Sequence, residues 1–107
     1  MGKDEQVRNA SLAVNTTPVV VSEEQYEGCA QRKVIFITNT SAGGQVITLS
    51  PDTDAVAGVG IVIGPGGFYQ DSADSGYIPN QSRISAVSNL AGGTLAIHER
   101  VIVKRGF

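Results

Sequence analysis

The sequence predicts an all-β fold, a small antiparallel β-sandwich of about seven strands with an extended N-terminal arm. Short runs rich in valine and isoleucine recur about every ten residues, a spacing typical of sandwich strands. The 13 glycines and 4 prolines lie mostly between these runs, where turns require them. No apolar segment has the length and the 3.6-residue period of a helix that connects parallel strands, so the sheets should be mainly antiparallel.

Size and charge limit what the chain can be. One domain is expected for 107 residues, and an apolar content of 41% allows a modest core. The net charge is −2 and the 8 Lys and Arg residues are scattered, which argues against a nucleic-acid partner. The single cysteine, Cys29, excludes an internal disulfide framework. No signal-peptide run or apolar span of about 20 residues is found, so no membrane is expected.

The chain divides into an arm and a domain. Residues 1–16 are polar without a clear period, and we interpret them as an arm that is mobile alone and ordered on a partner. Residues 17–107 form the β-sandwich domain with its C-terminal strand and tail. Its first strand is Val19–Val21, which Pro18 places at a strand start or a sheet edge. Ser22–Gln25 has capping-box spacing and predicts at most one helical turn.

The segment from Arg32 to Pro51 is the centre of the predicted domain. Val34–Ile37 is strongly β-forming, and Asn39–Gly44 is a cluster of turn residues. Gln45–Ser50 alternates strictly, with Ile47 and Leu49 on one face. This pattern predicts a β-hairpin of two paired strands.

Four further strands complete the domain. The sequence Gly64-Pro65-Gly66-Gly67 forces a tight turn between the first two of them, because proline fixes φ and glycine tolerates positive φ. The four predicted strands are Ile61–Ile63, Phe68–Gln70, Arg83–Ser88 and Thr94–Val103.

Several of these strands are apolar on both faces, although a sandwich strand needs only one apolar face. We interpret this pattern as cover by another subunit or a partner. The alternative is that β-branched residues simply suit exposed strand positions. The suspected interface residues are Val19, Val20, Val21, Ile35, Ile37, Val101, Ile102 and Val103.

No catalytic, cofactor-binding or metal site is predicted. His98 is the only histidine, and Glu99 beside it points to the opposite face of a strand, so the two form no dyad. Cys29 is predicted to be a buried structural thiol. The paired carboxylates in Asp52–Asp54 and Asp71–Asp74 are predicted to be solvated turn residues, with a loop calcium as the alternative.

Four segments, RKVIFITNT, GPGG, RISAVS and TLAIHE, occur here in an order that resembles small virion proteins of tailed bacteriophages. The similarity covers roughly residues 17 to 100. It implies a non-enzymatic head decoration (capsid cement) protein on the capsid exterior, made in the host cytoplasm. Its partners would be the major capsid protein and further copies of itself, with a homotrimer favoured and no cofactor. The N-terminal arm and the tail Arg100–Phe107 lie outside the resemblance and would suit tethering to neighbours by strand addition.

Two other functions are open at this point. One is a carbohydrate- or receptor-binding or structural module of a phage tail. The three tyrosines, Tyr26, Tyr69 and Tyr77, would offer a sugar-stacking platform for it, although packing in a core or interface is the simpler interpretation. The other is an enzyme, which would need a cleft that brings His98 together with a carboxylate.

Overall fold

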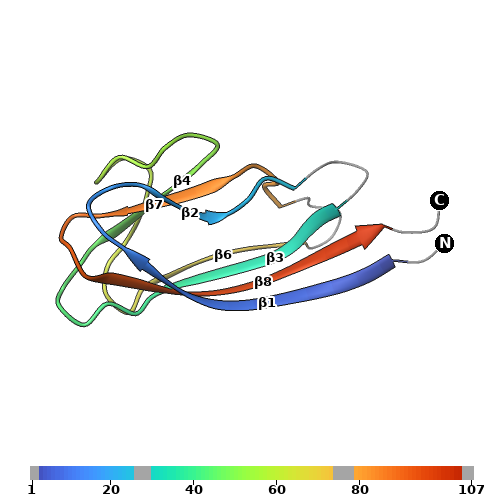
Figure 1. Cartoon of the computed structure of the whole chain (residues 1–107), viewed down its shortest axis with the longest axis horizontal. Coiled ribbons are helices and arrows are strands. Elements are labelled where there is room, and N and C mark those ends of the chain that lie inside the picture. The colour runs from blue at the N-terminus through green and yellow to red at the C-terminus, as the bar shows by residue number, and fades with distance from the viewer. Residues whose placement is uncertain (1–2, 26–29, 74–78, 105–107) are drawn as a thin grey trace.

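The computed structural model describes residues 3–25, 30–73 and 79–104 (Figure 1). These residues form eight strands and no helix. The strands are β1 (Lys3–Val14), β2 (Val19–Ser22), β3 (Ala30–Asn39), β4 (Ile47–Pro51), β5 (Ile61–Ile63), β6 (Phe68–Ser72), β7 (Ile84–Ser88) and β8 (Gly93–Lys104). All strand pairs are antiparallel.

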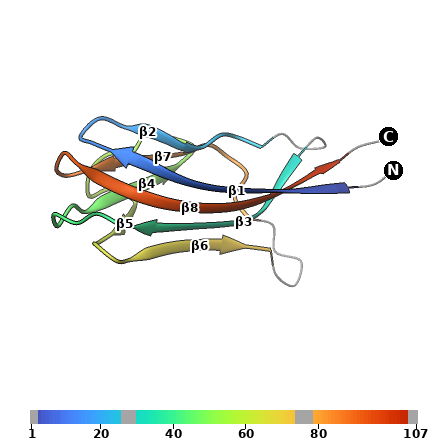
Figure 2. The same ribbon diagram turned by 60° about the horizontal axis from the view of Figure 1, so that its bottom comes forward.

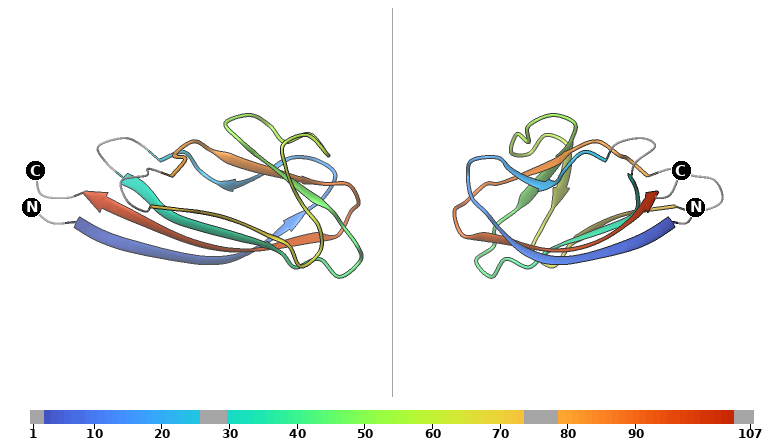
Figure 3. Two further views of the ribbon diagram at one scale, coloured as in Figure 1. Left: turned by 180° about the vertical axis from the view of Figure 1, so that it is seen from behind. Right: turned by 45° about the vertical axis from the view of Figure 1, so that its right-hand side comes forward.

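The strands form two sheets that pack face to face, as Figures 2 and 3 show. One sheet has the order β1-β8-β3-β6 and the other has the order β2-β7-β4-β5. The predicted antiparallel β-sandwich is therefore confirmed, with one strand more than expected.

The core lies between the two sheets. Each sheet contributes alternate aliphatic side chains, as a pleated strand with one buried face requires. Burying each of them stabilises the fold by about 1.5–3 kcal/mol. The largest fully buried aliphatic side chains are Val14, Ile35, Ile37, Ile47, Leu49, Ile84 and Leu95.

The additional strand is β1, so the interpretation of residues 1–16 as an arm outside the sandwich is wrong. β1 pairs with β8 over 12 residues without a bulge, from Lys3 opposite Lys104 to Val14 opposite Gly93. Val14 is fully buried, and Leu12 packs against the core. The alternating apolar residues Ala10, Leu12 and Val14 therefore give this half of β1 an inward face.

The predicted hairpin is also wrong, because β3 and β4 lie in different sheets. The apolar faces of both strands bury against the same core from opposite sides, which a paired hairpin in one sheet would not allow. Asn39 holds the crossing, since its side-chain amide donates to the carbonyls of Gln45 (2.9 Å) and Ile63 (3.0 Å).

The tight turn at Gly64–Gly67 is confirmed, with the Gly67 amide donating to the Gly64 carbonyl at 2.9 Å. It too connects strands of different sheets, β5 and β6. No helical turn forms at Ser22–Gln25; Ser22 is instead the last residue of β2.

The loop at 52–60 covers the outer face of the sheet that contains β4 and β7. The Ala55 amide donates to Ser85 Oγ and the Gly58 amide to Thr48 Oγ1, each at 2.9 Å. All residues of β7 and all but the last of β4 are buried, the inward residues by the core and the outward ones under this loop. For these two central strands, a loop of the same chain supplies the cover on the second face.

The molecule is elongated, with principal extents of 47 × 23 × 22 Å. The long strands β1 and β8 run past the ends of the opposite sheet (Figure 1). The inner face of this projecting end contains the buried ion pair of Arg32 and Glu99.

Candidate functional site

Two β-bulges turn polar side chains into the interior at this end of the sandwich. The β3–β8 register shifts between Arg32 and Val34, and the β2–β7 register shifts between Val20 and Ser22. A bulge inserts one extra residue and so resets the alternation of faces. Arg32 therefore faces inward although strict alternation from Ile35 would turn it outward, and Ser22 comes to face the same interior.

Arg32 is fully buried, and each of its five N–H donors has an acceptor. Its Nε donates to Glu99 Oε2 at 2.8 Å, which is also an ion pair. The other four bonds go to oxygens at the end of β2 and on the segments that flank it and β7: Ser22 Oγ, Glu23 O, Asn80 O and Ser82 O. The guanidinium thus ties β3 and β8 of one sheet to segments at the end of the other.

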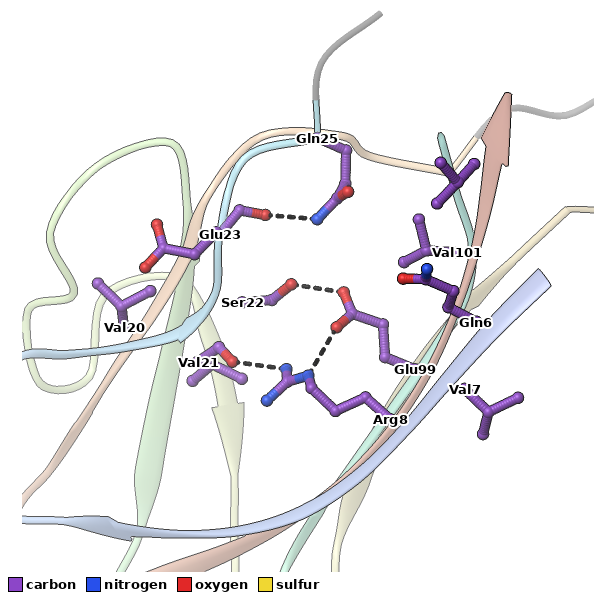
Figure 4. A pocket seen from close by; sticks show the side chains of 11 residues that line it. Gln6, Val7, Arg8, Val20, Val21, Ser22, Glu23, Gln25, Glu99 and Val101 are labelled. Carbon is purple, nitrogen blue, oxygen red and sulfur yellow. Dashed lines mark hydrogen bonds and ion pairs between the residues drawn. The ribbon is translucent and has the colours of Figure 1, made fainter. Parts of the chain in front are cut away.

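Glu99 receives the converging donors. Its Oε2 accepts from Arg32. Figure 4 shows the other two bonds, from Ser22 Oγ to Oε2 and from Arg8 Nε to Oε1 at 3.0 Å. Burial by itself raises the pKa of this carboxyl. The hydrogen bonds from Ser22, Arg32 and Arg8 and the charge of Arg32 outweigh burial, so the pKa of Glu99 lies below its ordinary value of 4.5.

This lowered pKa predicts a loss of stability in acid. Because the unfolded chain takes up the Glu99 proton at a higher pH than the folded chain, the stabilisation is complete above pH 4.5 and is lost as the pH falls through the folded pKa. Urea unfolding at pH 7 and pH 3 should show this loss. Glu99→Gln should reduce the pH dependence relative to the wild type. The same pH dependence in Glu99→Gln and the wild type would contradict the prediction.

Arg8 closes the network at the sheet edge. It belongs to β1, and its Nη2 donates to the Val21 carbonyl of β2 at 2.9 Å. Together with the bond to Glu99, this contact links the edge strand of one sheet to the edge strand of the other. The Arg8 side chain is 44% exposed, so solvent screening weakens its ion pair.

A cleft of about 530 Å³ lies beside this network, between β1 and β8 on one side and β2 on the other (Figure 4). Valines and amide side chains make up much of its lining. The lining residues are Gln6, Val7, Arg8, Val20, Val21, Ser22, Glu23, Gln25, Glu99, Val101 and Val103.

The network holds the two sheets together, and its groups are already engaged with one another. The Glu99 carboxylate is bound by three donors, and Ser22 Oγ both donates to Glu99 and accepts from Arg32. His98 lies on the outer face, where its Nδ1 is 2.7 Å from Asn9 Oδ1. Among the described residues, no group of three or more His, Cys, Asp and Glu could hold a metal ion.

The suspected interface residues divide into two sets. Val21, Ile35 and Ile37 are buried in the core, so their assignment to an interface is wrong. Their side chains face the opposite sheet, not a partner. The other five are half-buried, and three of them line the cleft: Val20, Val101 and Val103. Val19 packs against the core, and Ile102 lies on the outer face of β8.

The remaining candidate residues have mixed outcomes. Tyr69 packs against the core, as expected. Asp52 and Asp54 are exposed, as expected. Asp71 is instead buried, and its Oδ2 accepts from the main-chain amide of Asn80 at 3.0 Å. The predictions for Asp74, and those for Cys29, Tyr26 and Tyr77, fall outside the described residues.

A second surface feature is a cluster of exposed valines that sequence reasoning missed. Val56, Val59 and Val62 are 60%, 66% and 50% exposed. Val56 and Val59 pair across a turn of the 52–60 loop, and Val62 lies on β5 beside Thr48, to which that loop is bonded. We call these three residues the valine surface.

Neither protein-family models nor curated proteins give a match to this sequence. In the part of the chain that the structure describes, no helix of the length and apolarity needed to cross a membrane occurs.

Proposed function

We propose that this chain is a non-enzymatic capsid decoration protein that binds the major capsid protein shell of a tailed bacteriophage and stabilises the head. The sequence resemblance supplies this class of function. The structural observation that supports it is the valine surface, because contiguous exposed apolar patches often mark interaction sites. The network around Arg32 supplies rigidity, not chemistry.

Stabilisation would come from apolar area buried at contacts with the shell. A fully buried valine contributes about 1.5–3 kcal/mol, and the costs of association and ordering offset much of that sum. Weak contacts suffice if each molecule engages more than one shell subunit, because linked contacts raise the effective concentration.

The valine surface lies away from the cleft. β5 is the edge strand of its sheet and contacts β6, whereas β1 and β2 are the edge strands on the opposite side of the sandwich. A partner bound at the valine surface would therefore leave the β1 edge accessible. Substitutions can therefore test the valine surface and the β1 edge separately.

Replacing Val59 with lysine should weaken shell binding at least about tenfold, because a charge would have to be buried at the contact. The probe is an empty shell assembled from the major capsid protein of the phage genome that contains this chain, and the readout is co-sedimentation. Gln70→Lys, at an exposed position on β6, is the matched control and should bind like the wild type. Wild-type binding by Val59→Lys, or no shell binding by the wild-type chain, would contradict the proposal.

One observation favours the alternative of a carbohydrate- or receptor-binding module of a phage tail. Phe36 and Phe68 stack with ring centroids 5.1 Å apart and an interplanar angle of 8°. Phe36 lies on β3 and Phe68 on β6. Phe68 is 60% exposed, so an aromatic surface is open to solvent on the outer face of the sheet that contains these two strands. Binding to an immobilised glycan that is lost in Phe68→Ala, without shell binding, would establish this function instead.

A further inference from the structure

We propose that the free edge of β1 pairs with β1 of a second copy of this chain, antiparallel and about a twofold axis. Such pairing would join two four-stranded sheets into one continuous sheet. The inference does not depend on capsid binding, because it uses a different edge of the molecule.

The four edge strands, β1, β6, β2 and β5, differ in how well they are protected against pairing with another chain. β2 has four residues, follows Pro18 and contains a bulge, whereas β5 has three residues and β6 has five. Short length, proline, bulges and charged side chains are features that hinder edge-to-edge pairing. β1 has 12 residues, no proline and no bulge, and its charged residues lie only in its first half, Lys3–Arg8. Its length and regular register make it the edge best suited to accept another strand.

The hydrogen bonds around β8 show which main-chain groups of β1 face this edge. The Thr40 amide donates to the Thr94 carbonyl at 3.0 Å, so Thr94 faces β3. The main-chain N–H and C=O groups of successive strand residues point to the two neighbouring strands in turn. Those of Leu95, Ile97 and Glu99 therefore point toward β1.

The residues opposite these three, Leu12, Ala10 and Arg8, therefore bond to β8. The main-chain groups of Val7, Asn9 and Ser11 then point away from β8, toward the free edge. Asn15, which follows β1 and continues this odd-numbered series, also points away from β8, because its carbonyl accepts from the Ser88 amide at 2.8 Å. Among the described strands, β1 pairs with β8 alone.

The charge pattern of β1 favours a second copy in antiparallel orientation. All charged residues of the strand lie in its first half, Lys3–Arg8, and none lies in Asn9–Val14. Antiparallel pairing centred on Val7 or Asn9 sets no two like charges opposite each other. A parallel arrangement in register would place each charge beside its copy, which is destabilising.

The shape of the sandwich allows the same arrangement. The opposite sheet covers the inner face of the second half of β1, where Leu12 and Val14 contact the core. The first half borders the open cleft. Antiparallel pairing would set the covered half of one β1 beside the open half of the other. The second sheets of the two copies would therefore be staggered along the strand direction.

Light scattering after size exclusion tests this pairing. The wild-type chain should have twice the monomer mass of 11.1 kDa. Val7→Pro removes an edge-facing amide but no bond to β8, and should give a folded monomer with wild-type circular dichroism. The matched control Val7→Ala makes the same side chain smaller but keeps the amide, and should remain a dimer. Should Val7→Pro fail to fold, Ser11→Pro removes a second edge-facing amide.

Three results would overturn the proposal: a wild-type monomer, a wild-type trimer as the resemblance implies, or a dimer of Val7→Pro. Shell binding is read out separately with Val59→Lys. Failure of one proposal therefore leaves the other testable.

Discussion

Replacing Glu99 with leucine is expected to lower the free energy of unfolding by about 3–5 kcal/mol. Arg32 has no exposed side-chain surface and Glu99 only 5%, so this substitution leaves a buried guanidinium without its carboxylate. Arg8 and Ser22 lose an acceptor at the same time. Urea unfolding monitored by circular dichroism measures the change.

The control for this prediction is Glu5→Gln. Glu5 pairs with Arg100, and both side chains are nearly half exposed, at 44% and 45%. Such a pair contributes about 0–1 kcal/mol, so Glu5→Gln should be close to neutral. Equal effects for the two glutamates would contradict the structural role of Glu99.

The double variant Arg32→Met with Glu99→Leu should be more stable than Glu99→Leu alone. Removing both charges eliminates the uncompensated one, and apolar replacement of a buried ion pair is often neutral. The two residues are in contact, so their effects should not be additive.

Replacing Ile37 with alanine is the second large effect expected, a loss of about 2–5 kcal/mol. Ile37 is fully buried between the sheets, where truncation leaves a cavity. Val62→Ala is the control, because Val62 is 50% exposed and a surface substitution usually changes stability by less than about 0.5 kcal/mol. An unchanged stability for Ile37→Ala, together with lost self-association, would instead place Ile37 at an interface.

Strand positions could be predicted from the sequence, but strand partners could not. β-branched runs and glycine turns mark where β3, β4 and β5 lie, because these signals are local. The alternation in Gln45–Ser50 shows which side chains share a face but not which sheet contains the strand. The short connection after Asn39 therefore indicated a hairpin, although the structure uses it to cross between sheets.

The candidate site was predictable only in part. Glu99 falls in the inward alternation of β8 after Leu95 and Ile97, so a buried carboxylate could have been expected there. Arg32 could not, because the bulge beside it reverses the face that alternation from Ile35 assigns. The polar composition of Lys3–Asn9 likewise concealed β1, whose projecting half has little core to face.

Hydrogen exchange of individual β1 amides, measured by NMR at low and high protein concentration, tests most directly that β1 is an integral strand with an open edge. The amides of Arg8, Ala10 and Leu12 should be protected at every concentration, because they bond to β8. Those of Val7, Asn9 and Ser11 should exchange rapidly in dilute solution and become protected as the concentration rises. Rapid exchange of all six at every concentration would show a mobile arm, and edge-facing amides that stay unprotected at high concentration would exclude pairing through β1.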